Sequence, residues 1–445
     1  MTIATLGELP TLHTASTLLR SGRVSAVELL EHVIGRIEDT EPHVHAYVSH
    51  DLDQARRDAA QADRTRPRGP LHGIPFGVKD VFAVAGGRTR CGSRALADHV
   101  TERDATVVAA LRTAGAVFVG KHVTHELTCG VDEPPTRNPH AWNHYAGGSS
   151  VGSGVSVAAG SSLFALGTDA AGSVRIPASA TGVVGFKPTH GLLSTEGIIR
   201  ASTAPSIDHV GIIARTVEDV GLVLEGLAPG TVRPLGQAVQ DTRLGVLRVR
   251  GDRDTDPEVA ALFDRALDRL AGLGARLVPV DIPELHDAPE VVATYFATEL
   301  AEGNRLLFAQ RQADYHPAVR QLITAGLRTP ENARTAAREL RTQITAAIAN
   351  AFLREQLDAL VSPTMSRPPP RLDDLNPATD LTRLVAHTCP FSLTGQPAIS
   401  VPCGITAAGL PVGLQIAGRL HDETTVLNIA AAYSPPPIPI HHVWS

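Results

Sequence analysis

The sequence predicts an α/β fold in which helices cover a large β-sheet. Apolar runs of strand length alternate with stretches where apolar residues recur at helical spacing, a pattern typical of this class. Hydrophobic residues make up 43% of the chain and charged residues 19%, which excludes a globally disordered protein. At 445 residues the chain can bury one large core, and no stretch has the composition of a flexible interdomain linker.

The alternation begins in the N-terminal quarter of the chain. Residues 25–37 carry apolar side chains at helical spacing, with Ser25 as the expected N-cap. Residues 51–63 have the composition of a polar, alanine-rich helix, and the prolines and glycines of 66–73 end this helical region. The elements expected next are a buried strand at 74–82, a helix at 104–113 and a strand at 116–120.

Residues 147–186 are rich in glycine and serine, with nine glycines. Glycine permits close backbone approach, so this density suggests that backbone groups take part in chemistry. A flexible linker is the alternative, but the apolar runs at 155–159 and 163–166 have no purpose in a linker.

The chain alternates again from about residue 240, and Pro257 suits the first position of a helix. The elements expected there are strands at 244–249, 276–280, 359–361, 398–401 and 412–417, and helices at 257–271, from about 287 to 356, and at 424–432.

Several classes of protein are disfavoured by composition. The net charge of −6 makes no strong electrostatic case for nucleic acid or a membrane surface. The four cysteines include no C-x-x-C pair, which suits a reducing compartment. No signal peptide or bilayer-spanning apolar run is found, so a cytoplasmic location is expected.

Cofactor and metal motifs are also missing from the sequence. The sequence contains neither G-x-x-x-x-G-K-[ST] nor G-x-G-x-x-G, the two glycine-rich motifs that bind phosphate groups. His122, His125 and Glu126 form H-x-x-H-E, which matches no zinc ligand pattern. We therefore expect no cofactor and no metal.

The sequence G-S-S-V-G at 148–152 fits G-x-S-x-G, the nucleophile elbow of α/β-hydrolases, with Ser150 at its centre. An elbow needs a strand immediately before it and a helix after it. Residues 141–146 have the pattern of a loop, which disfavours this interpretation.

Four longer motifs, in a fixed order along the chain, favour a different kind of active site. They are H-G-I-P-F-G-V-K-D at 72–80, G-G-S-S-V-G-S at 147–153, G-T-D-A-A-G-S-V-R-I-P-A-S at 167–179 and G-V-V-G-F-K-P-T at 182–189. Weaker matches follow at 208–211, 395–402 and 409–415. Together they resemble the amidase signature family over most of the chain.

The resemblance implies one amidase domain, residues 1–445, on a large twisted mixed β-sheet covered on both sides by α-helices. In it, residues 1–65 are expected to be an N-terminal helical segment, 66–215 the signature core with the catalytic residues, and 216–445 the remaining sheet and the helices of the substrate pocket.

The resemblance also implies a Ser-Ser-Lys triad. Ser173 is expected to form an acyl-enzyme. Ser149 is expected to relay the proton of Ser173 to Lys79, and the peptide bond between Gly148 and Ser149 is expected to be cis. Only the neutral amine of a lysine can act as a base, and the apolar neighbours of Lys79 would lower its pKa. Lys79, Lys121 and Lys187 are the only lysines among 40 cationic residues, and the last two are expected to be structural.

By the same resemblance, backbone N–H groups form the oxyanion hole, a site whose donors stabilise the developing negative charge. The expected donors belong to Ala170, Ala171, Gly172 and Ser173. Ala171 replaces the commoner glycine, and its Cβ would narrow the hole; allophanate hydrolases have a similar alanine. Val151 also replaces a glycine, which puts the local packing in doubt.

Other residues are expected to support the site. Ser150 should hydrogen-bond within the relay, and Asp169 and Arg175 should orient the loop without reacting. The substrate contacts expected are Thr128, Cys129 and Gly130, with further walls from residues 128–135, Tyr295, Phe296, Leu307, Phe308, Tyr315 and 389–391.

The expected activity is hydrolysis of a linear small-molecule amide. No nucleic acid or membrane partner is expected, and a homodimer is the assembly considered. One alternative is the glutaminase component of the tRNA-dependent amidotransferase, which works with partner chains. The E-V-K-R-R-I-type helix expected in that component is replaced here by V-R-Q-L-I-T-A-G at 319–326. The other alternative is a biosynthetic homologue that uses the acyl-enzyme to form an amide.

Overall fold

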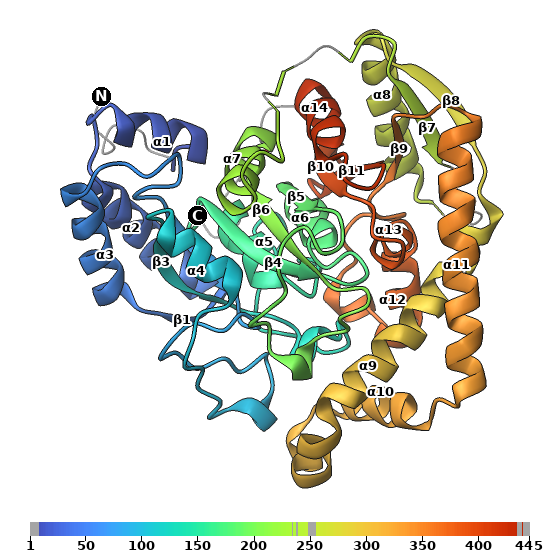
Figure 1. Cartoon of the computed structure of the whole chain (residues 1–445), viewed down its shortest axis with the longest axis horizontal. Helices are drawn as coiled ribbons and strands as arrows, with labels where there is room; N and C mark the ends of the chain where they lie inside the picture. Colours follow the sequence, from blue (N-terminus) through green and yellow to red (C-terminus); the bar gives the residue numbers. More distant parts are fainter. Residues whose placement is uncertain (1–8, 234, 237–238, 248–254, 434–437, 439–445) are drawn as a thin grey trace.

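The structure, a computed structural model, describes residues 9–233, 235–236, 239–247, 255–433 and 438. Within these residues helices surround one extended β-sheet (Figure 1). The strands are β1 Tyr47–His50, β2 Pro75–Lys79, β3 Val117–His122, β4 Phe164–Asp169, β5 Val184–Lys187, β6 His209–Ala214, β7 Arg243–Leu247, β8 Arg276–Val280, β9 Ala359–Pro363, β10 Ala398–Ile405 and β11 Pro411–Gly418.

The α-helices of the described residues lie before, between and after these strands. They are α1 Leu12–Arg20, α2 Ala26–Val44, α3 Leu52–Arg64, α4 Thr106–Thr113, α5 Val151–Ala158, α6 Arg175–Thr181, α7 Val217–Leu227, α8 Pro257–Gly272, α9 Ala288–Arg311, α10 Pro317–Arg328, α11 Glu331–Arg354, α12 Pro377–Val385, α13 Cys389–Leu393 and α14 Glu423–Tyr433.

The described sheet has eleven strands in the order β1-β3-β2-β4-β6-β5-β10-β11-β9-β7-β8. Strand β2 pairs in parallel with β3 and β4, and β7 pairs in parallel with β8 and β9. The other pairings are antiparallel. The prediction of a large mixed sheet covered by helices is therefore confirmed.

Local capping explains why the N-terminal helices begin where the sequence predicts. The Ser25 hydroxyl accepts from the Glu28 N–H, while the Glu28 carboxylate accepts from the Ser25 N–H, which makes a capping box. Helix α2 continues past residue 37 because Thr40 and Val44 extend its buried face. The Asp51 side chain likewise caps α3 by accepting from the Gln54 N–H.

Two elements of the signature core differ from the prediction. Strand β2 ends at Lys79 because the chain turns there, with the Val81 and Phe82 N–H groups donating to the Lys79 carbonyl. Residues 151–158 form helix α5, whose side chains are all buried. Gly152 permits this packing, since a Cβ there would lie 2.2 Å from the Ala46 carbonyl oxygen.

In the C-terminal half, the helical region at 287–356 divides into α9, α10 and α11. Pro317 and Pro330 mark the two divisions, as expected from the preference of proline for helix starts. Strand β8 has the predicted bounds, and α8 is one residue longer than predicted. The strand predicted at 244–249 is β7, and its last two positions lie outside the described residues.

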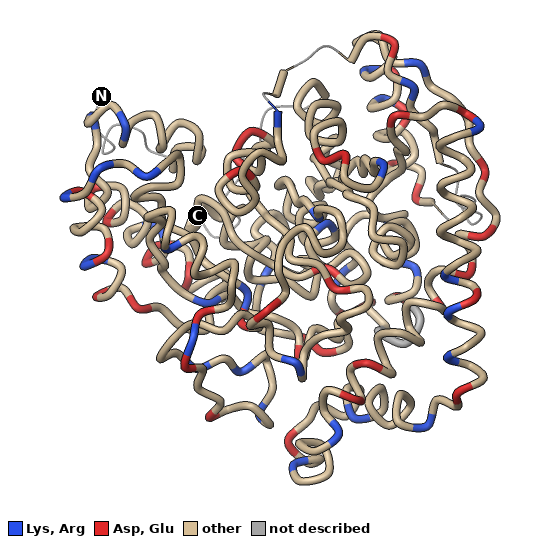
Figure 2. Tube along the Cα trace, viewed as in Figure 1, with Lys and Arg blue, Asp and Glu red and all other residues tan. Residues whose placement is uncertain are grey.

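Figure 2 shows basic and acidic residues interspersed over the outer elements, for example along α11. No helix among the described residues is long and apolar enough to cross a membrane.

Candidate active site

Lys79 stands at the carboxyl end of β2, in the interior of the sheet. Its side chain is fully buried, and every residue of β2 is buried with it. The Lys79 Nζ hydrogen-bonds to Ser149 Oγ at 2.8 Å and to Thr168 Oγ1 at 2.9 Å. The fold thus brings Lys79 and Ser149 together across 70 residues of sequence.

Burial controls the charge of this lysine. Removal from water lowers the pKa of Lys79 to about 7, against the opposing attraction of the Asp208 and Asp169 carboxyls. Burial also raises the pKa of Asp208, whose Oδ2 accepts from the Ala204 N–H. Both groups are therefore shifted toward their uncharged forms, which leaves the Lys79 amine able to accept a proton near neutral pH.

Hydrogen bonds fix both the backbone and the hydroxyl of Ser149. The peptide bond between Gly148 and Ser149 is cis, as the family resemblance implied. The Ser149 carbonyl oxygen accepts from Thr124 Oγ1 at 3.1 Å and from the His125 N–H at 3.4 Å. Ser149 is itself buried.

Ser150 is fully buried, and its environment argues against the nucleophile elbow. Its hydroxyl donates to the Thr168 carbonyl oxygen and accepts from the Thr168 N–H. Residues 141–149, all of them described, contain an isolated bridge at His144 but no strand. The helix that an elbow needs after the serine is present, but the strand before it is not.

Thr168 is a site residue that the sequence reasoning missed. It lies on β4, the parallel neighbour of β2, next to Asp169 in the G-T-D motif. Parallel neighbouring strands bring their carboxyl ends to the same edge of a sheet, and that rule could have placed Thr168 beside Lys79.

Ser173 lies two residues before α6 and, unlike Lys79 and Ser149, is partly exposed. Its carbonyl oxygen accepts from the Ser150 N–H at 3.2 Å, which ties its loop to the start of α5. The Asp169 carboxylate accepts from the N–H groups of Gly172 and Val174, on either side of Ser173. The backbone around Ser173 is therefore held by one buried carboxylate.

One of the four predicted oxyanion donors already has an acceptor. The Gly172 N–H donates to Asp169 Oδ1 at 2.7 Å. Gly172 has a φ of 133°, and a Cβ there would lie 2.2 Å from Thr388 Oγ1, so only glycine fits. Gly172 thus shapes the loop, and its N–H is not directed at a substrate.

Asp169 and Arg175 form a fully buried ion pair. The five N–H groups of Arg175 make hydrogen bonds to Asp169 Oδ1 and Oδ2, Ser392 Oγ, Gln415 Oε1 and the Thr388 carbonyl oxygen. Although burial opposes ionisation, Arg175 holds the pKa of Asp169 well below its ordinary value. The pair thus links the Ser173 loop to α13 and β11.

The predicted substrate contacts at 128–130 are largely turned inward. Thr128 Oγ1 donates to the Ser202 carbonyl oxygen, and the buried Cys129 Sγ lies 3.6 Å from the Leu127 carbonyl oxygen. Gly130 is half-buried and faces Leu381 of α12.

The predicted aromatic wall divides into two groups. Phe308 and Tyr315 contact each other in the core, where the Tyr315 hydroxyl donates to Asn304. Tyr295 and Phe296 are half-buried and pack against the apolar cluster that includes Ala170. Phe296 also packs against the cluster that contains Phe308 and Tyr315, so the two groups adjoin.

Lys121 and Lys187 occupy structural positions, as expected. Lys121 Nζ pairs with Asp80 Oδ1 at 2.9 Å, and Lys187 Nζ donates to the Gln396 and Pro188 carbonyl oxygens. The two histidines of the H-x-x-H-E motif have different partners. His122 contacts Ser153 Oγ, whereas His125 pairs with Asp132.

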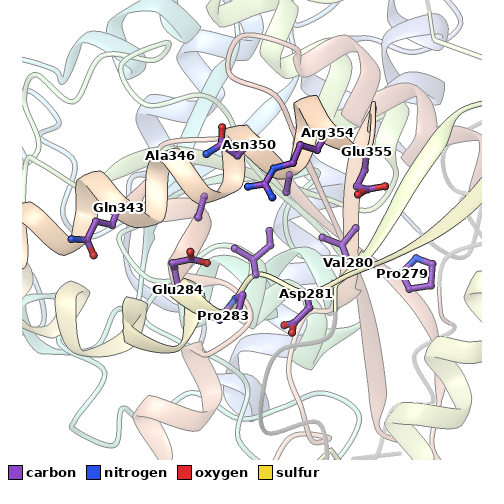
Figure 3. A pocket seen from close by; sticks show the side chains of 13 residues that line it. Pro279, Val280, Asp281, Pro283, Glu284, Gln343, Ala346, Asn350, Arg354 and Glu355 are labelled. Atoms are coloured by element: carbon purple, nitrogen blue, oxygen red, sulfur yellow. The ribbon is translucent and has the colours of Figure 1, made fainter.

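A cavity of about 480 Å³ lies elsewhere, between α11 and the segment after β8 (Figure 3). Polar side chains on its walls include Asp281, Glu284, Gln343, Asn350 and Arg354. Neither Lys79, Ser149 nor Ser173 is among the described residues that line it, so it is separate from the candidate site.

Comparison with known proteins identifies the family of the chain. A family model described as Amidase matches residues 28–427. A glutamyl-tRNA(Gln) amidotransferase chain from Moorella thermoacetica is 34% identical, over 95% of this chain and 96% of that protein.

Two solved structures are also similar to the chain. A crystal structure of an amidase is 33% identical with a TM-score of 0.87, covering 95% of this chain and 99% of that one. The 6-aminohexanoate cyclic dimer hydrolase, solved with its substrate, is 29% identical with a TM-score of 0.85, covering 96% of both chains. From its fold, its motifs and these relatives, the chain belongs to the amidase family, whose members act on C–N bonds.

Proposed function

We propose that this protein hydrolyses a linear amide bond of a small molecule, with Ser173 as nucleophile, Ser149 as relay and Lys79 as base. The observation that carries the proposal is the 2.8 Å contact between Ser149 Oγ and a buried Lys79 amine whose pKa is lowered to about 7. A lysine with this pKa is matched to base catalysis at neutral pH.

In the proposed reaction, Ser173 Oγ attacks the amide carbon and its proton passes through Ser149 to Lys79. The N–H groups of Ala170, Ala171 and Ser173 would stabilise the oxyanion, since Gly172 is engaged by Asp169. The proton then returns to the leaving amine as the C–N bond breaks. Water next attacks the acyl-enzyme by the same route, releasing the acid and restoring Ser173.

The relatives favour a second candidate, the glutaminase role within a tRNA-dependent amidotransferase, because the amidotransferase chain from Moorella thermoacetica is 34% identical. Residues 319–326, where the helix typical of that glutaminase component was expected, lie in α10 with a different sequence. The similarity to a solved amidase supports the first candidate, and the similarity to 6-aminohexanoate cyclic dimer hydrolase supports hydrolysis over amide transfer.

A substrate panel separates these functions. We expect the purified chain alone to release ammonia or amine from aryl, aliphatic or urea-type amides faster than from L-glutamine. Turnover of glutamine that requires two copurifying partner chains would instead establish the amidotransferase role. Formation of a new amide when an amine is added would indicate the biosynthetic alternative.

We also expect a fluorophosphonate to label Ser173 in the wild-type protein and to leave Ser173→Ala unlabelled. Ser173 is partly exposed, whereas Ser150 is buried and hydrogen-bonded to Thr168. Peptide mapping by mass spectrometry identifies the labelled residue. Label on Ser150 that survives in Ser173→Ala would refute the assignment of the nucleophile.

A further inference from the structure

We propose that His125 and Asp132 are positioning residues that hold the Ser149 relay against Lys79. This inference rests on the proposed function of Ser149, but it concerns side chains to which that mechanism assigns no role.

Two hydrogen-bond donors hold the carbonyl group of Ser149. The Thr124 hydroxyl and the His125 N–H both donate to this oxygen. Two donors from consecutive residues fix the plane of the peptide that follows Ser149. The direction of Ser149 Oγ toward Lys79 therefore depends on where residues 124 and 125 lie.

Asp132 fixes those residues in turn. Its Oδ1 lies 3.3 Å from His125 Nδ1, and both of its carboxylate oxygens accept from the Glu126 N–H at 3.0 Å. One carboxylate thus holds both the ring of His125 and the next backbone amide. Burial opposes ionisation of Asp132, but the His125 ring and the Glu126 N–H keep its pKa below the ordinary value.

The ring of His125 supplies a third restraint, directly on Gly148. A Cβ built on Gly148 would lie 2.6 Å from His125 Nε2 and 2.8 Å from Tyr145 Oη. The two rings meet edge to face, with centroids 6.4 Å apart. Gly148 therefore lies flush against both side chains, and no larger residue would fit.

These contacts restrain the residues on both sides of the Ser149 hydroxyl. Without the ring or the carboxylate, the 148–150 backbone loses these restraints relative to Lys79, although the contacts of Ser150 with Ser173 and Thr168 and that of Ser149 with Thr124 remain. His125 is buried at 2% exposure. We therefore expect the rate of the chemical step to change while substrate binding does not.

The test compares His125→Ala and Asp132→Ala with the wild-type protein. We expect the rate of fluorophosphonate labelling at Ser173, and kcat for any substrate found, to fall about 10- to 100-fold, as misplacement of catalytic groups typically causes. We expect KM to stay within about twofold, since the His125 ring is buried and the Asp132 carboxylate is already engaged by His125 and the Glu126 N–H. Asp132→Asn, which keeps one acceptor oxygen within reach of His125 and the Glu126 N–H, should recover part of the loss.

His72→Ala is the matched control, because it also removes a buried imidazole. The His72 Nε2 lies 3.0 Å from the Ala62 carbonyl oxygen, and the residue precedes β2 at the end opposite Lys79. We expect this variant to lose thermal stability but to keep the wild-type labelling rate.

Folded His125→Ala and Asp132→Ala proteins that label at the wild-type rate would overturn the inference. If His125→Ala does not fold, His125→Asn is used, since it also removes the ring from Gly148 while leaving a polar group beside Asp132. A wild-type protein that is not labelled at Ser173 would instead refute the proposed function, so the two failures are distinguishable.

Discussion

The Lys79→Ala protein is expected to react with a fluorophosphonate at Ser173 about 10²- to 10⁴-fold more slowly than the wild type at pH 7.5, the usual contribution of a positioned general base. The change removes the amine that hydrogen-bonds to Ser149 Oγ and would receive the proton. The rate of label incorporation measures this step without a known substrate. Near-normal labelling would place the base elsewhere, for example on a histidine.

The wild-type rate should also depend on pH in a defined direction. The protonated Lys79 amine cannot accept a proton, and burial lowers its pKa to about 7. Labelling should therefore rise about tenfold per pH unit below that value and level off above it. A flat profile between pH 5 and 9 would contradict a lysine base.

Lys121→Met is the control for loss of a buried lysine. Lys121 lies on β3 and pairs with Asp80, which directly follows β2, and the Lys121 side chain is 3% exposed. We expect reduced stability with a labelling rate within about twofold of the wild type, because Lys121 makes no contact with the relay. A loss as large as that of Lys79→Ala would show that any buried lysine in this sheet is needed.

Arg175→Met is expected to lower the free energy of unfolding by about 3–5 kcal/mol, the usual cost of breaking a buried ion pair. The change leaves Asp169 buried without its ion-pair partner, and it removes all five hydrogen bonds of the guanidinium. Urea denaturation followed by circular dichroism measures the loss. Labelling of Ser173 should slow as well, because Asp169 holds the adjacent N–H groups.

Arg276→Met provides the comparison at an exposed ion pair. Arg276 and Asp241 pair while 63% and 62% exposed, so we expect a loss of less than about 1 kcal/mol. Equal losses in the two variants would show that burial does not set the contribution of the Arg175 pair.

Much of the fold could be predicted because its signals are local. The capping box of Ser25 and Glu28, the bounds of β8 and the start of α8 at Pro257 depend on residues adjacent in sequence. Helix α5 was missed because it is buried on every side, which leaves no amphipathic period, and because its glycines lower helix propensity.

The sequence predicted some features of the candidate site and missed others, because its motifs are local. The motifs identified Lys79, Ser149 and Ser173, and the structure places the first two in direct contact. They did not identify Thr168 as a partner of Lys79, the engagement of the Gly172 N–H, or the inward turn of Thr128. Each of these depends on a contact between segments whose approach no local pattern encodes.

By itself, the sequence determined the family and the α/β class, and it indicated the residues that we propose to react. A lysine kept among arginines was already informative, since only lysine can lose its proton. Only the tertiary structure decided which groups surround that lysine. The order β3-β2-β4 sets Thr168 beside Lys79, and the segment after β3 sets His125 against Gly148. Strand order and register arise from long-range packing, which a periodic pattern does not specify.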